Sequence, residues 1–497
     1  MRKVELTGGR ALTQADLNRS GALPREVMDA AEDIVRDVRD RGDAAVREYC
    51  TRFDGACPES FRVPDELVKA APSMVDPEFL ESLTRARDQI LAFHQKEREE
   101  SWFTTRPDGT LLGVQVTPVA SAAVYVPGGR AQYPSTVLMD TIPAKVAGVP
   151  RVVMVTPPQR DGSLSAYTLA AAALAGVDEV YAVGGAQAIG AVAYGTESIP
   201  ACDKIVGPGN AYVAAAKRYV SGDVGIDMVA GPSEVCVLAD AIADPVVVAA
   251  DLMAQAEHDP LASCYLVTCD AELPARVLAA VEKLVSQSPR EEITRASLDN
   301  RGVIVVANDL DAAVDAVNVV APEHLELHCK DAMSLLGKVK NAGAIFVGAW
   351  SSEPLGDYVA GPNHTLPTGG TARFSNPLGV YDFQKRSSVI CYTPEGMLAD
   401  APATQAMAQA EGLWAHALSV GMRRRLAEKG LEGYADADAA CEGAHRVAWP
   451  EDLAAPRRAL PARLLEAGGL GCPPSPSAPA RRCRASSRTT RRSRPAA

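Results

Sequence analysis

The chain has 497 residues, of which 47% are hydrophobic and 23% are charged, and its formal net charge is -12. This length predicts two or three domains, or one large interleaved unit, with ample material for a core. The negative charge argues against nucleic acid as the main partner. No apolar run reaches transmembrane length without a charge, Pro or Gly, which argues against a membrane protein. The N-terminus has no apolar signal segment and the eleven cysteines include no C-x-x-C pair, so we expect a cytoplasmic protein with reduced thiols.

The first part of the chain carries no recognisable chemistry. Residues 1–22 are predicted to form a polar arm, and Leu23–Glu48 and Asp76–Glu99 are predicted helices with charged outer faces. From Ser121 onward, short apolar strands alternate with Ala-rich helices. Strands are predicted at 122–126, 151–156, 179–183 and 204–206, and helices at 135–149, 163–176, 186–194 and 211–220. This alternation predicts a doubly wound parallel sheet whose ligand lies at the carboxyl ends of the strands.

A second α/β region follows Ser233. Its predicted strands are 235–239, 263–268, 303–307, 325–329 and 344–347, and its predicted helices are 245–256, 273–287, 310–320 and a short one near 332–339. An irregular stretch after Pro377 precedes predicted helices at 399–416 and 421–429. Beyond about Gly468 the chain is rich in Pro, Ser, Ala and Arg, which predicts a disordered extension without function rather than an interaction arm.

Three glycine turns follow strands of the first predicted sheet. They are YVPGG from Tyr125, GGAQAIG from Gly184 and GPGN ending at Asn210. A turn of this kind at a strand-to-helix junction offers backbone N–H groups to a phosphate. None of them is a G-x-G-x-x-G fingerprint, and most single glycine turns are only tight turns. Three at the strand ends of one sheet favour a nucleotide site.

Polar residues that suit a divalent cation recur in the second half of the chain. Gln255 and His258 are three residues apart near a predicted helix end, so they share one face and offer an amide oxygen and an imidazole nitrogen. With Asp357 and His416 they form a set of nitrogens and oxygens that suits zinc or a similar ion. The alternative is that each is an isolated polar residue, because the long spacing does not establish convergence.

Glu323 and His324 follow Pro322 at the start of a predicted strand. Neighbouring residues cannot share a strand face, but both can reach a cleft from a loop and act as water activator and general base. The alternative is a simple ion pair. His364 lies in a Gly-Pro-Asn-His turn and is predicted to be exposed. No Cys or Ser lies in a setting typical of a nucleophile. The remaining histidines are predicted to be structural or on the surface: His94, His328 and His445.

Taken together, these segments resemble the histidinol dehydrogenases. The motifs VYVPGGRAQYPS, VGGAQAIGA, VGPGNAYVAAAK, AGPSE, QAEHDP, APEHLEL, GDYVAGPNHTLPT and AEGLWAHALSV occur in the order of that family, over roughly residues 20–430. The chain beyond about Tyr434 has no counterpart, and its composition would also suit a misread or fused reading frame.

The resemblance implies oxidation of L-histidinol to L-histidine through L-histidinaldehyde, with reduction of two NAD⁺, at the end of histidine biosynthesis. It implies Glu323 and His324 as the acid–base pair, with His324 as general base and Glu323 as activator of water. By motif, it assigns one Zn²⁺ per subunit to Gln255, His258, Asp357 and His416. It assigns NAD⁺ to Tyr125, Gln187 and Asn210. It assigns substrate to Ser233, His364, Glu411 and His324 together with the metal ligands.

The resemblance also implies an α/β fold of two incomplete Rossmann-like domains, similar to aldehyde dehydrogenases, in an intertwined homodimer in which His416 completes the partner's zinc site. The expected segments are an N-terminal arm (1–25), a discontinuous α/β domain (26–124 and 235–378), an NAD-binding domain (125–234), a dimer-crossing segment (379–432) and, from its composition, a disordered tail (433–497).

Three other functions compete with this hypothesis. A zinc hydrolase would use the same metal set without NAD, and would not need three glycine turns. A catalytically inactive binding protein would tolerate replacement of the His, Glu and Asp set. A thiol-dependent aldehyde dehydrogenase would be inactivated by blocking one Cys and would need no metal.

Overall fold

The computed structural model describes residues 1–17, 19, 23–55, 57–128 and 132–429, so the predicted tail at 433–497 lies outside the described residues. The chain divides into two compact units. The first comprises Met1–Thr104 and Gly113–Val389, and the second Thr105–Leu112 together with the chain from Ile390. None of the described helices has the length and apolar character needed to cross a bilayer.

The first unit contains a five-stranded sheet in the order β6-β5-β4-β7-β8, with parallel pairs throughout. Alternate residues of β4 face opposite cores: Ala122 and Val124 pack with α5 and α6, and Ala123 and Tyr125 with α1, α7 and α8. The elements are β4 (Ser121–Tyr125), α5 (Pro134–Ala147), β5 (Arg151–Thr156), α6 (Ala166–Ala175), β6 (Glu179–Ala182), α7 (Gly185–Tyr194), β7 (Lys204–Val206), α8 (Ala211–Val220) and β8 (Gly225–Ile226). The predicted doubly wound parallel sheet is confirmed.

The helices before β4 pack on this same sheet, which differs from the predicted grouping of 26–124 with 235–378. The buried stripe of α1 (Arg25–Arg41) contacts α7 and α8, and α4 (Pro77–His94) contacts α5. The predicted helix at 23–48 is divided at Gly42, whose φ of 57° ends α1 before α2 (Asp43–Tyr49). The short α3 (Asp65–Ala70) packs against α6.

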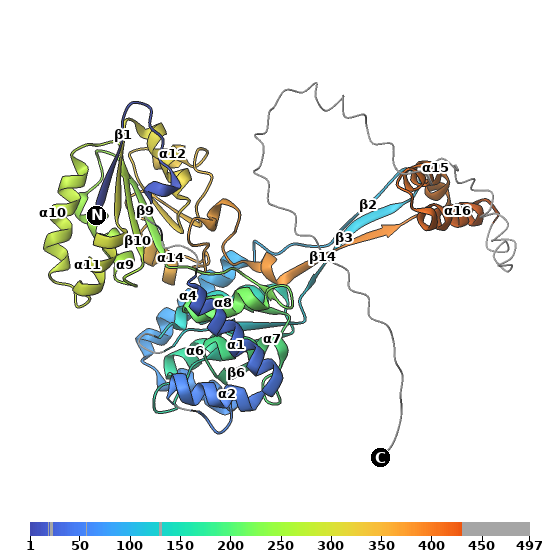
Figure 1. Cartoon of the computed structure of the whole chain (residues 1–497), viewed down its shortest axis with the longest axis horizontal. Helices are drawn as coiled ribbons and strands as arrows, with labels where there is room; N and C mark the ends of the chain where they lie inside the picture. The colour runs from blue at the N-terminus through green and yellow to red at the C-terminus, as the bar shows by residue number, and fades with distance from the viewer. Residues whose placement is uncertain (18, 20–22, 56, 129–131, 430–497) are drawn as a thin grey trace, which may run out of the picture. The chain divides into compact units, whose positions relative to one another are not determined.

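The second sheet of the same unit is six-stranded and parallel, in the order β1-β11-β10-β9-β12-β13. Helices α9, α10 and α11 cover one face, and α12 covers the other (Figure 1). The elements are β9 (Glu234–Ala239), α9 (Pro245–Ala256), β10 (Ser263–Thr268), α10 (Leu273–Val285), α11 (Glu291–Arg301), β11 (Val303–Ala307), α12 (Leu310–Val320), β12 (His324–His328), α13 (Ala332–Leu335), β13 (Ala344–Val347) and α14 (Glu353–Tyr358).

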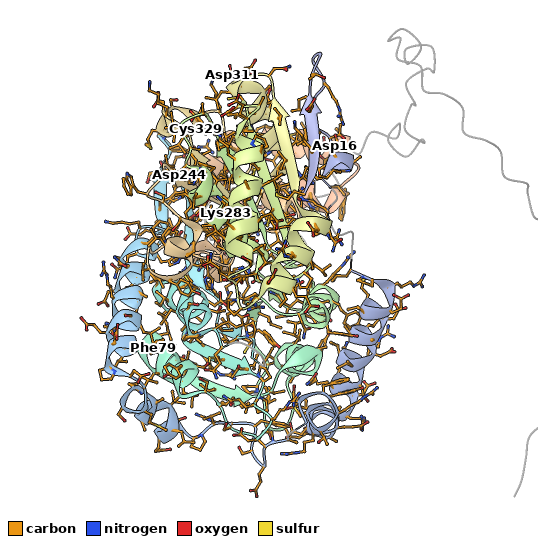
Figure 2. The ribbon with its side chains drawn as sticks, turned by 90° about the vertical axis from the view of Figure 1, so that its left-hand side faces the viewer. Asp16, Phe79, Asp244, Lys283, Asp311 and Cys329 are labelled. Atoms are coloured by element: carbon orange, nitrogen blue, oxygen red, sulfur yellow. The ribbon has the colours of Figure 1, made fainter. Side chains whose placement is uncertain are left out.

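The direction of α9 determines where the candidate site forms. Because α9 connects two parallel strands, β9 and β10, it runs antiparallel to the sheet. Asp244 at its start and Cys329 just beyond β12 lie at the same end of the sheet (Figure 2). The end of α9, with Gln255, therefore lies beside the beginning of β12, with His324.

Part of the predicted polar arm is a strand. β1 (Arg2–Leu6) is an edge strand of the six-stranded sheet, with Val4 opposite Val305, and its side chains at Val4 and Leu6 are buried. Arg19 reaches the same sheet, because its guanidinium forms a bidentate ion pair with the buried carboxylate of Glu234 at 2.8 and 3.0 Å. The alternation of polar and apolar residues in RKVEL was the sequence pattern that could have predicted β1.

The stretch after Pro377 that was predicted to be irregular also contains a strand. β14 (Gln384–Cys391) forms a three-stranded sheet with β3 (Leu111–Pro118) and β2 (Trp102–Thr105). The second unit then contains α15 (Pro394–Ala410) and α16 (Trp414–Lys429). Thr393 caps the start of α15, and Gly412, with φ of 77°, separates the two helices several residues earlier than predicted.

Candidate active site

Glu323 and His324 meet at the amino end of β12, and both are buried. Glu323 precedes the strand and its Oε2 accepts a hydrogen bond from the backbone N–H of Glu234 at 2.8 Å. Burial raises the pKa of Glu323 to about 7, although the nearby His324 opposes this. A carboxyl group with this pKa can exchange a proton near neutral pH.

Gln255 connects His324 with His258. Its Oε1 lies 3.1 Å from His324 Nδ1, and its Nε2 lies 3.2 Å from His258 Nδ1. Gln255 is fully buried at the end of α9, whereas His258 is exposed one turn further on. Gln255 and His258 therefore lie on one face, as predicted. If the Nδ1–H of His324 is directed at the amide oxygen of Gln255, Nε2 is the ring nitrogen of His324 that faces the site.

Asp357, on α14, faces Nε2 of His324. Its Oδ1 lies 3.7 Å from His324 Nε2. Burial alone would lower the pKa of His324, but Glu323 and Asp357 outweigh burial and raise it to about 10. Burial would likewise raise the pKa of Asp357, but His324 and His364 hold it below its usual value. These carboxylates therefore favour the protonated imidazole.

Glu353 belongs to the same cluster, and sequence reasoning missed it. One ligand atom from each of Glu353, His324 and Asp357 lies within 4.8 Å of the others. Glu353 is 2% exposed, and burial raises its pKa to about 8. It stands one helical turn before Asp357, and this i,i+4 spacing of two carboxylates was the signal that could have identified it.

His364 and Ser233 border these residues. His364 was predicted to be exposed but is half-buried, with Nδ1 3.0 Å from the backbone oxygen of Asp357 and Nε2 3.2 Å from Thr136 Oγ1. Burial lowers its pKa. Ser233 is also half-buried, directly before the residue whose N–H binds Glu323.

The candidate nucleotide residues lie on the five-stranded sheet, at the carboxyl ends of β4, β6 and β7. The hydroxyl of Tyr125 is buried and accepts a hydrogen bond from the N–H of Gly185 at 3.0 Å. Gln187 is 1% exposed, and neither polar atom of its amide has a hydrogen-bond partner within the described chain. Asn210 is exposed and caps α8, with Oδ1 accepting from Tyr212 and Val213. An unpartnered buried amide beside a helix N-terminus fits a polar ligand such as NAD⁺.

Glu411 and His416 belong to the second unit. Glu411 directly follows α15, His416 lies in the first turn of α16, and both are exposed. The first unit brings together the other predicted residues of the metal and acid–base sets: Gln255, His258, Asp357, Glu323 and His324. One ligand atom from each of His324, Glu353 and Asp357 converges, and His258 is connected to this group through Gln255. The converging imidazole and carboxylates, with His324 Nε2 buried and unpartnered among the described residues, fit a divalent cation such as Zn²⁺.

Comparisons with known proteins identify the family of this chain. The family model described as histidinol dehydrogenase matches residues 17–424. Over 414 residues the chain is 52% identical to the histidinol dehydrogenase of Bacillus licheniformis, covering 83% of this chain and 97% of that protein. It is 52% identical over 408 residues to that of Aquifex aeolicus, covering 82% and 94%.

The fold is also similar to a solved structure. A crystal structure of histidinol dehydrogenase from Elizabethkingia anophelis matches with a TM-score of 0.81 and 34% identity, covering 86% of this chain and 99% of the other. The resemblance inferred from the motifs is thus confirmed, and the chain belongs to the histidinol dehydrogenase family of enzymes.

Proposed function

We propose that this chain oxidises L-histidinol to L-histidine through L-histidinaldehyde, with two NAD⁺ as hydride acceptors and Zn²⁺ as its metal, in the cytoplasm. Family membership supports the reaction. The observation that carries the proposal is the Gln255 amide, which joins the candidate base His324 to the candidate metal ligand His258. The eight described cysteines are all free thiols, which supports a reducing compartment.

Gln255, His258 and Asp357, with His416, would hold the metal. Zn²⁺ bound there would supply a fixed coordination point for the amine and imidazole of the substrate, and so direct the carbinol carbon toward the nicotinamide. Ser233, His364 and Glu411 would contact the rest of the substrate. Tyr125, Gln187 and Asn210 would contact NAD⁺ at the edge of the five-stranded sheet.

His324 removes the hydroxyl proton in the first oxidation, while the carbinol hydride passes to NAD⁺ and the aldehyde forms. Gln255 holds Nδ1, so the proton moves to Nε2. Because Glu323 and Asp357 favour the charged form of His324, the ring accepts this proton more readily when a cation neutralises the Asp357 carboxylate. Asp357 faces the candidate base His324 and is also a candidate metal ligand, so metal binding would change the basicity of His324.

Glu323 serves the second oxidation. It removes a proton from water as the water oxygen adds to the aldehyde carbon, and His324 returns its proton to the aldehyde oxygen, which gives the hydrate. The neutral His324 then takes a hydroxyl proton from the hydrate while the second hydride passes to another NAD⁺. The product is the carboxylic acid, which loses its proton to solvent. Its pKa of about 7 suits Glu323 to this exchange.

Removing the metal is expected to abolish NADH formation from L-histidinol, and adding Zn²⁺ back is expected to restore it. The measurement is NADH absorbance before chelation, after chelation and after Zn²⁺ addition. Mg²⁺ addition is the control, because the nitrogen-containing ligand set disfavours it. Zinc-loaded protein that forms no NADH would contradict the proposal and favour a hydrolase.

We also propose a homodimer in which His416 completes the partner's site. His416→Asn and His258→Asn chains are each expected to be inactive. Mixing them by co-expression is expected to restore about a quarter of the wild-type activity, because half of the dimers are mixed and each mixed dimer has one intact site. Activity that stays absent in verified mixed dimers would place His416 in the site of its own chain.

A further inference from the structure

A second polar cluster lies deeper along the same strand and helix. Side chains of His324, Glu326 and His328 share one face of β12, because residues two apart along a strand point the same way. The opposing helix α9 carries Asp251 one turn before Gln255. His324 and Gln255 belong to the candidate active site. The remaining residues, Asp251, Glu326 and His328, form what we call the inner cluster.

The inner cluster is buried and its atoms converge. Asp251, Glu326 and His328 are 7%, 0% and 5% exposed. His328 Nε2 lies 3.4 Å from Asp251 Oδ2 and 3.4 Å from Glu326 Oε2, and all three atoms lie within 4.8 Å of one another. None of these three atoms has a hydrogen-bond partner in the part of the chain that the structure describes.

These separations are those of ligands around a shared ion. A charge-assisted N–H···O hydrogen bond would bring the atoms to about 2.7–2.9 Å. Tetrahedral Zn²⁺ with bonds of about 2.0–2.2 Å places neighbouring ligand atoms roughly 3.3–3.6 Å apart, the edge of the tetrahedron. The two distances from His328 Nε2 fall within that interval.

The charge balance favours a cation as well. Two carboxylates meet one imidazole, and within the described residues neither carboxylate forms an ion pair with a Lys or Arg. A net negative charge in a buried place is costly, so the cluster needs either a bound cation or a proton on Asp251, whose pKa burial and Glu326 raise to about 7. The second oxygen of Glu326 accepts a hydrogen bond from the N–H of Glu353 at 2.8 Å, which orients Oε2 toward the cluster.

We propose that Asp251, Glu326 and His328 form a second divalent-cation site that binds Zn²⁺ and ties α9 to β12 behind the candidate active site. One nitrogen and two oxygens are typical protein ligands of this ion. The proposal does not rest on the reaction proposed above, because it concerns other ligands.

The test counts zinc in the full-length protein. Protein stripped with chelator and dialysed against Zn²⁺ is expected to hold about two equivalents per chain by mass spectrometry of the metal. His328→Gln is expected to hold about one, His258→Asn about one, and the double variant none. His94→Gln is the matched control, because His94 is also buried beside a carboxylate, that of Glu97, and should leave both equivalents in place.

Thermal unfolding gives a second measurement that does not depend on activity. Zn²⁺ is expected to raise the Tm of His258→Asn, which retains the inner cluster, and not that of the double variant. Asp251→Asn provides a second route if His328→Gln fails to fold. One equivalent in the wild type that is lost in His258→Asn and unchanged in His328→Gln would overturn the proposal, and would indicate a proton shared within the inner cluster instead.

Discussion

Replacing His324 with Asn is expected to lower kcat for L-histidinol oxidation by about 10²–10⁴-fold, the usual contribution of a general base. Asn retains an amide that can bond to Gln255, so the fold and the metal set should persist. It has no nitrogen that accepts a proton in place of Nε2. Steady-state NADH formation gives kcat and KM, and we expect KM to change much less than kcat, because the loss is confined to the transition state.

His94→Asn is the control for this variant. His94 is a buried histidine of the same unit whose Nδ1 lies 2.7 Å from a carboxylate oxygen, but it has no place in the proposed reaction. It should retain kcat. A His324→Asn enzyme with kcat within a few-fold of the wild type would remove His324 from its role as base.

Replacing Glu323 with Gln is expected to slow oxidation of L-histidinaldehyde by about 10²–10⁴-fold while L-histidinol is still converted to the aldehyde. Gln can still accept the hydrogen bond from the N–H of Glu234, but it cannot remove a proton from water. Each oxidation is measured separately, with L-histidinol or L-histidinaldehyde as the starting substrate. Glu97→Gln, which alters the carboxylate beside His94, should leave both rates unchanged.

Glu323→Gln is also expected to change the pH dependence of the first oxidation. The Glu323 carboxylate raises the pKa of His324, so its removal lowers that pKa. Because a base must be neutral to act, the rate of the first oxidation rises as pH passes the pKa of His324. This rise should therefore move to lower pH in Glu323→Gln. Normal aldehyde oxidation, or a rise that moves to higher pH, would contradict the role given to Glu323.

The alternating elements could be predicted closely from sequence, because their apolar runs end at clear turn residues. The strands predicted at 263–268 and 303–307 match β10 and β11. The packing partner of residues 26–124 could not be predicted this way. The amphipathic stripe of α1 indicates that one face is buried, but not against which sheet. β14 is an edge strand of mostly exposed residues, so its periodicity is weak, and β1 alternates over only a few of its five residues.

Site residues could be predicted from the sequence where they lie a few positions apart or where they belong to a recognisable motif. The pair Gln255 and His258 follows from helical spacing, and Glu323 with His324 from adjacency. Glu353 was missed. The inner cluster was also missed, because polar residues two apart on β12 indicate a shared site only when α9 is known to pack opposite them. His328 was predicted to be structural or on the surface, and the structure has it buried between two carboxylates. His416 lies far along the chain from the other candidate metal ligands, so local sequence patterns could not predict that it joins them.

The central claim, that one site performs both oxidations, is tested most directly by counting NADH per molecule of limiting L-histidinol. We predict two NADH per substrate, with L-histidine as the product, and accumulation of one NADH per substrate with L-histidinaldehyde in Glu323→Gln. One NADH per L-histidinol from the wild-type enzyme would contradict the second oxidation, and with it the role of Glu323.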